Sequence, residues 1–145
     1  MKKEFVMRGQ TANEGEEILN FSGYKPGYAF KLVEFQIYMA AGIGSSTVEL
    51  CASITAAKTA EDPVNPNFNN PGLIGVTSFY RYEASNQPQS IVNDTFLITQ
   101  NLILKVRDTH TGSDPVNWQC KFESVKMTGP EEAAANFKQF SIFDE

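Results

Sequence analysis

Apolar and polar side chains alternate along most of this chain, as they do in β-strands that bury one face. In residues 31–39, four apolar side chains beginning at Val33 alternate with Glu34, Gln36 and Tyr38. The same period predicts further strands at 3–8, 16–22, 47–57, 73–82, 91–98, 102–107 and 117–127. The segments 91–98 and 102–107 fit either two strands or one long strand bent by a bulge near Thr99 and Gln100.

Clusters of turn-forming residues separate these segments and predict loops. The longest loop, 61–72, contains three prolines and four asparagines. A second cluster at 84–90 contains Pro88, and proline removes a hydrogen-bond donor from a strand. We therefore expect 84–90 to be a loop. The remaining loops are expected at 9–15, 23–27, 40–46 and 108–116.

The C-terminal segment has a different pattern. Thr128 and Glu131 have the spacing of a capping box, and the acidic and alanine residues that follow favour a helix over residues 129–141. Phe137 and Phe140 fall on one side of this helix, so we expect it to dock on the sheets or on a neighbouring molecule.

Seven or eight short strands in 145 residues predict an all-β fold. We expect one domain, residues 1–145, built as a two-sheet antiparallel sandwich of the jelly-roll or immunoglobulin-like kind with a short C-terminal helix. Twelve Lys and Arg against 17 Asp and Glu leave a net charge of −5, which argues against nucleic acid as a partner. The sequence shows neither a secretory signal nor an apolar stretch of membrane-spanning length.

The two cysteines are expected to be free thiols. Alternation places Cys51 on the polar face of its strand with Glu49 and Ser53, whereas Cys120 falls on the apolar face of 117–127. Because the two thiols point in different directions, a disulfide between them is disfavoured, and small apolar packing is the simpler role.

Residue types that carry chemistry are sparse. The single histidine, His110, lies between Asp108 and Asp114, which together could hold a metal, but the same run is typical of a turn, and we favour the turn. The oxygens of Glu61, Asp62 and four asparagines in 61–72 suggest calcium, but they lack regular ligand spacing. We therefore predict no catalytic, cofactor-binding or metal-binding residue, and a protein that is not an enzyme. A hydrolase is the alternative hypothesis for this chemistry.

Aromatic residues near loops are the better candidates for binding. Tyrosines at turns and strand ends suit a protein interface or a sugar-stacking platform, and core packing explains them equally well. The interface candidates are Tyr24, Tyr28, Phe68, Tyr80, Tyr82, Phe137 and Phe140.

Four stretches resemble the small β-sandwich structural proteins that bacteriophages encode near their capsid genes. They are residues 4–9 (EFVMRG), 19–24 (LNFSGY), 93–101 (NDTFLITQN) and the terminal helix at 131–140. The resemblance implies a virion protein, either a capsid or a capsid-decoration subunit, that is assembled in the host cytoplasm. Its implied partners are further copies of itself or the major capsid protein. We expect the loop 61–72 and the chain ends to make these contacts. The alternative is a carbohydrate- or receptor-binding module with a glycan ligand, although alternation places the further stacking candidate, Trp118, inward.

Overall fold

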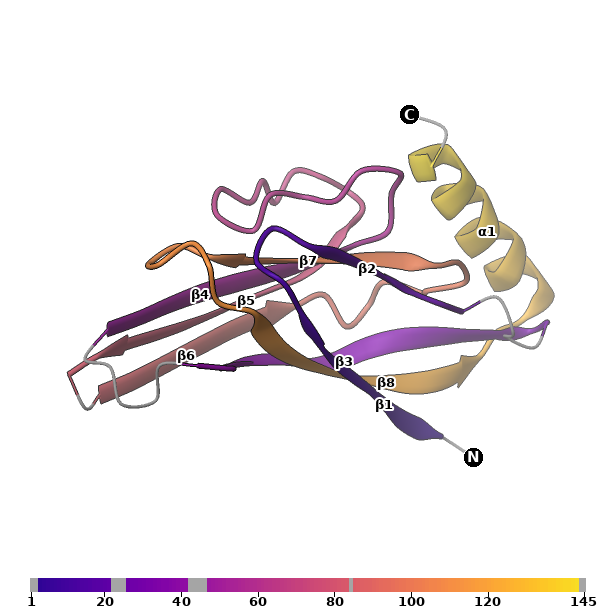
Figure 1. Cartoon of the computed structure of the whole chain (residues 1–145). Helices are drawn as coiled ribbons and strands as arrows, with labels where there is room; N and C mark the ends of the chain where they lie inside the picture. The colour runs from indigo at the N-terminus through magenta and orange to yellow at the C-terminus, as the bar shows by residue number, and fades with distance from the viewer. Residues whose placement is uncertain (1–2, 22–25, 42–46, 84, 144–145) are drawn as a thin grey trace.

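The protein is an antiparallel β-sandwich with a C-terminal helix, as the alternation predicts (Figure 1). The computed structural model describes residues 3–21, 26–41, 47–83 and 85–143. These residues form β1 (Glu4–Thr11), β2 (Glu16–Leu19), β3 (Tyr28–Met39), β4 (Thr47–Thr55), β5 (Leu73–Tyr82), β6 (Ser85–Val92), β7 (Leu102–Asp108), β8 (Val116–Lys126) and α1 (Gly129–Phe143). One sheet has the strand order β1-β8-β3, and the other has the order β2-β7-β4-β5-β6. No helix in the described ranges has the length and hydropathy needed to cross a membrane.

The strands form three of the four pairs of a jelly roll. In this fold eight strands wind as one long folded hairpin, so that strand 1 pairs with 8, 2 with 7, 3 with 6, and 4 with 5. Here β1 pairs with β8, β2 with β7, and β4 with β5. An immunoglobulin-like sandwich would place the first two strands in one sheet, whereas β1 and β2 lie in different sheets.

The fourth jelly-roll pair, β3 with β6, does not form a ladder here. β6 forms its ladder with β5, and it is joined to β3 by a hydrogen bond that the Ser90 hydroxyl donates to the Phe35 carbonyl (2.7 Å). One sheet is therefore five strands wide and the other three, and side chains along nearly the whole of β6 are exposed to solvent. The inner face of β5 and β6 extends beyond the edge strand β3.

The expected loop at 84–90 is wrong for its described part, because residues 85–92 form β6. The Asn93 N–H donates to the Ile74 carbonyl, so the main chain of Asn93 faces β5. Along an antiparallel strand every second residue faces the same neighbour, and Pro88 is an odd number of residues from Asn93. The main-chain groups of Pro88 therefore face away from β5. Pro88 therefore costs the ladder no hydrogen bond, since β6 is an edge strand. The expected strand at 91–98 is wrong as well: β6 ends at Val92, and Ile98 forms an isolated bridge with Phe30 of β3.

Several element ends also differ from the expectation. β1 continues to Thr11, which shortens the expected loop at 9–15, and β3 begins at Tyr28 instead of residue 31. The turn expected at 23–27 lies mostly outside the described residues, but Gly27 is described and has a positive φ of +87°, which glycine adopts readily.

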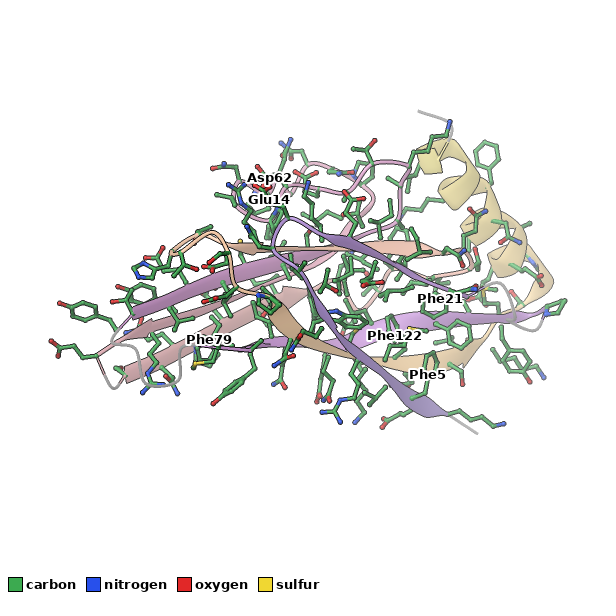
Figure 2. The ribbon with its side chains drawn as sticks, in the orientation of Figure 1. Phe5, Glu14, Phe21, Asp62, Phe79 and Phe122 are labelled. Carbon is green, nitrogen blue, oxygen red and sulfur yellow. The ribbon has the colours of Figure 1, made fainter. Side chains whose placement is uncertain are left out.

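The core lies between the two sheets. At the end nearest α1, the rings of Phe5, Phe21 and Phe122 point toward one another (Figure 2), with centroids 5.5 Å apart for Phe5–Phe122 and 5.0 Å apart for Phe21–Phe122. Toward the other end, the indole Nε1–H of the buried Trp118 donates to the Thr11 hydroxyl (2.9 Å). Trp118 therefore faces inward, as its alternation predicts.

The long loop that connects β4 to β5 folds over the outer face of the five-stranded sheet (Figure 1). The Ser53 hydroxyl donates to the Glu61 carbonyl (2.7 Å), and the Glu61 N–H donates to the Thr55 hydroxyl (3.0 Å). Ser53 and Thr55 are fully buried as a result. The assignment of Ser53 to the polar face of its strand holds, but this face is covered by the protein's own loop.

The capping box predicted for the C-terminal helix is present, because the Thr128 hydroxyl accepts from the Glu131 N–H and the Glu131 carboxylate accepts from the Thr128 N–H (both 3.3 Å). The helix docks through Ala135 and Ile142, which are buried. Phe137, which we expected on the docking side, is 73% exposed. The side chain of Phe140 lies outside the described residues.

Candidate functional site

A groove of about 1000 Å³ lies where the five-stranded sheet extends past β3. Residues of β1, β3, β5, β6 and β8 line it. Its floor includes Thr77 and Phe79 of β5, which are buried. One wall is β6, with Asn86 and Pro88, and the other is β3, with Gln36. A groove of this volume is within the range of small-molecule sites.

The outer face of the three-stranded sheet supplies the rest of the groove. The two halves of this sheet face differ in charge. The half nearer the start of β1 carries the ion pair between Lys121 Nζ and the Glu4 carboxylate (3.0 Å), which raises the pKa of Lys121. In the half that lines the groove, Arg8, Gln119 and Gln36 form one row across the three strands. Beside this row, Gln10 Nε2 donates to the amide oxygen of Asn117 (3.0 Å). The groove half is therefore built of amides and one cation.

Tyr38 is the aromatic residue at the rim of the groove. Its ring and the Phe79 ring make an edge-to-face contact, with centroids 5.4 Å apart and planes inclined by 63°. Tyr38 is 46% exposed, although Phe79 is buried. The contact with a buried ring orients Tyr38 while leaving much of its surface open to a ligand.

The candidate residues chosen from the sequence occupy several places. Phe68, Tyr80 and Tyr82 lie on the outer side of the five-stranded sheet and are exposed. Tyr28 is half-buried at the start of β3, opposite Lys126 of β8, and Phe137 projects from α1. Tyr24 lies outside the described residues, as does the side chain of Phe140.

Four exposed apolar side chains lie on the outer side of the five-stranded sheet, and we call this set the outer patch: Phe68, Tyr80, Tyr82 and Ile91. Gln89 and Ser78 lie between Ile91 and Tyr80. Phe68 and Ile91 line one shallow hollow of about 150 Å³. Tyr80 and Tyr82 follow on the same outer face of β5, because side chains alternate and Ile91 pairs with Val76. The four side chains are between 37% and 61% exposed.

The loop around His110 is a turn organised by Asp108. The buried Asp108 carboxylate accepts from the N–H groups of His110 (3.0 Å), Thr111 (3.2 Å) and Asp114 (3.1 Å), and from the Thr111 hydroxyl. A carboxylate offers about four acceptor positions, so this one is saturated. Asp108, His110 and Thr111 share a hollow of about 70 Å³, but the Asp108 carboxylate has no position left to serve as a base.

The oxygens of the long loop are likewise engaged within the protein. The Glu61 carboxylate accepts from the Asn67 N–H (2.8 Å) and the Asn70 amide (2.6 Å), and the Asp62 carboxylate accepts from the Val64 N–H (2.9 Å). These bonds brace the loop. Within the described part of the chain, no group of three or more His, Cys, Asp or Glu residues is arranged to hold a metal ion.

Both cysteines are free thiols. Cys120 is fully buried in the core, which raises the pKa of its thiol to about 12. Cys51 is half-buried on the outer face of β4; burial and, to a smaller extent, the negative charge of Asp62 raise its pKa to about 11, although Arg107 acts in the opposite direction.

We expect both thiols to react slowly in the folded protein. With a pKa near 11, about one Cys51 in a thousand is a thiolate at pH 8, and the thiolate is the reactive form. Dithionitrobenzoate should label native protein slowly at pH 8, and should label both thiols quickly in guanidinium chloride. Fast labelling of one thiol in native protein would contradict the environment described for Cys51.

The groove residues were not recognised as a site from the sequence. Alternation correctly placed Tyr38 and Gln36 on the outward face of β3, and an aromatic ring on a polar face was the available signal. The wall that faces them was missed because residues 85–90 were interpreted as a loop. The row of Arg8, Gln119 and Gln36 depends on pairing between distant strands, which alternation does not reveal.

Neither a family model nor a curated protein matches this sequence. Among solved structures, a lectin from Bauhinia forficata in complex with GalNAc aligns with 88% of this chain and 100% of its own, at 9% sequence identity and a TM-score of 0.24. A TM-score this low supports neither a shared fold nor a shared activity.

Proposed function

We propose that this protein is a structural subunit of a virus particle and that it works by joining further copies of itself through the outer patch. The observation that supports the proposal most is the exposure of Phe68, Ile91, Tyr80 and Tyr82 on one face of β5, β6 and the long loop. Exposed apolar side chains gathered on one face often mark a surface that binds a partner.

The surroundings of the outer patch suit an interface between proteins. Gln87 and Gln89 of β6 lie on the same face as Ile91 and offer hydrogen-bonding groups beside the apolar rings. Tyrosine and phenylalanine are enriched at the centres of interfaces, and polar groups at their rims. A self-complementary contact centred on this patch would place it against its own counterpart in a second subunit.

The viral setting rests on the resemblance of four sequence stretches to phage structural proteins, together with the fold class. Jelly rolls build many viral capsid domains, and they also occur in lectins and other proteins. Since one fold serves many functions, the fold alone does not select the virion role. The outer patch supplies the physical reason to prefer assembly.

Light scattering of the purified protein, followed by electron microscopy, tests the proposal. We expect the wild type to form oligomers or particles, and the double variant Phe68→Ser, Ile91→Ser to raise the dissociation constant at least about tenfold. Ile18→Ser is the matched control, because Ile18 is an exposed apolar residue on β2 at the opposite edge of the same sheet.

Two results would count against the proposal. One is a wild type that stays monomeric at about 50 µM, a concentration at which even weak specific dimers are populated. The other is an association that the double variant leaves unchanged or that Ile18→Ser weakens equally.

A further inference from the structure

We propose that the groove between β3 and β6 binds an oligosaccharide, with the Tyr38 ring stacked on one sugar and Arg8 placed to meet an acidic group. This binding site is separate from the outer patch and goes beyond the assembly role.

The shape follows from the unequal widths of the sheets. Because β5 and β6 extend past β3, the inner face that would normally be covered forms an open floor with Phe79 beneath it. Figure 2 shows Phe79 at the end of the sandwich away from the Phe5, Phe21 and Phe122 rings. Tyr38 stands against the Phe79 ring and is held there by a buried neighbour. A half-exposed tyrosine at a groove rim is suited to stack on the apolar face of a sugar ring.

The walls match sugar hydroxyls in their hydrogen-bonding capacity. Gln36, Gln119 and Asn86 come from three strands, and each amide both donates and accepts hydrogen bonds. A sugar hydroxyl also does both, so amides pair with it whichever way its hydrogen points. The bond between Gln10 and Asn117 fixes another amide at the same end of the sheet.

The charge of the groove is unlike that of the whole molecule. The chain has a net charge of −5, but no Asp or Glu is among the described residues that line the groove. Arg8 is the charged residue there, and it lies in one row with Gln119 and Gln36. An arginine without a carboxylate beside it in the lining is placed to bind the carboxylate or sulfate of an acidic sugar.

The strand edges argue against an extended peptide as the occupant. The edge of β6 that faces away from β5 contains Pro88, which has no N–H to offer an added strand. On β3, the Phe35 carbonyl already accepts from the Ser90 hydroxyl. Peptides that extend a sheet depend on these main-chain groups. Pro88 and the bonded Phe35 carbonyl reduce the main-chain pairing open to a peptide, whereas the side-chain amides in the lining can pair with sugar hydroxyls.

A glycan array that includes neutral, sialylated, uronic-acid and sulfated oligosaccharides tests the proposal, followed by NMR titration of the best ligand with the full chain. We expect binding to an acidic oligosaccharide, a loss of at least about tenfold in affinity for Tyr38→Ala, and retention in Tyr38→Phe, which keeps the ring. Arg8→Gln should weaken binding to the acidic ligand more than to its neutral counterpart.

Tyr80→Ala is the matched control, because Tyr80 lies on the opposite face of β5 in the outer patch. Thermal melting of every variant separates lost binding from lost folding. Absence of glycan binding by the wild type at millimolar ligand overturns the proposal, and so does a Tyr38→Ala variant that stays folded and binds normally. Binding of an extended peptide in the groove, shown by shifts of β6 amides, would also overturn it. None of these outcomes depends on self-association through the outer patch.

Discussion

Replacing Phe122 by alanine is expected to lower the free energy of unfolding by about 3–5 kcal/mol. Phe122 is fully buried on β8, the central strand of the three-stranded sheet. Its ring packs against those of Phe5 and Phe21, with centroids 5.5 and 5.0 Å away. Truncation would leave a cavity lined by rings from β1 and from the segment after β2, and strands held in two sheets have little freedom to collapse into it.

Urea denaturation followed by fluorescence or circular dichroism measures this effect. Phe137→Ala is the matched control, since it removes the same ring from an exposed position on α1 and should change stability by less than about 0.5 kcal/mol. If Phe122→Ala cost no more than this control, the aromatic cluster would not be the structural centre that we describe.

Replacing Asp108 by alanine is expected to cost about 2–3 kcal/mol, the second largest effect. The Asp108 carboxylate accepts three main-chain N–H groups and the Thr111 hydroxyl from the loop that follows β7. Without it, the N–H groups of His110, Thr111 and Asp114 lose their acceptor in a partly buried turn. Urea denaturation measures the loss, and a change below about 0.5 kcal/mol would contradict this role.

The same residue is expected to make stability depend on pH. Burial is the largest single influence and would raise the pKa of Asp108, but the hydrogen bonds from Thr111, Asp114 and His110 together outweigh it, and the pKa is lowered. A carboxyl whose folded pKa is below its unfolded value, near 3.9, stabilises the protein above that value. This contribution is lost as the pH falls through the lower, folded pKa.

Asp108→Asn provides the test of this pH dependence. The wild type should lose stability as the pH is lowered below about 4, and the variant should lose less over the same range because its amide does not titrate. Denaturation curves at pH 7, 4 and 3 give the comparison. Parallel losses in the two proteins would assign the acid sensitivity to other carboxyl groups.

The two proposed binding surfaces lie on opposite faces of the same strands. On β5, Phe79 faces the groove and the adjacent Tyr80 belongs to the outer patch, since neighbouring side chains of a strand point to opposite sides. An assembled subunit could therefore keep its groove open to a glycan. The same alternation allows single substitutions to affect one surface and leave the other intact.

The local alternation of apolar and polar residues was sufficient to predict the fold class and the position of most strands. Alternation identified the faces of β8 and of β3 from Glu34 to Met39, because a strand with one buried face must repeat every two residues. It misplaced Val33, because a bulge between Leu32 and Glu34 puts Leu32 on the buried face instead. The capping box of α1 was also readable, since Thr128 and Glu131 interact across a single turn. Pro88, by contrast, was misinterpreted because its effect depends on whether β6 is an edge strand, which is a property of the sheet.

By itself, the sequence determined that this protein is a β-sandwich with a short C-terminal helix, since period and capping act over a few neighbouring residues. Tertiary structure alone decided the jelly-roll winding, the cover that the long loop places over Ser53, and the pairing of β6 with β5. It also brought Tyr38, Gln119 and Asn86 to one groove from strands far apart in the chain. These outcomes depend on which strands pair across long sequence separations, and alternation is the same whichever partner a strand takes.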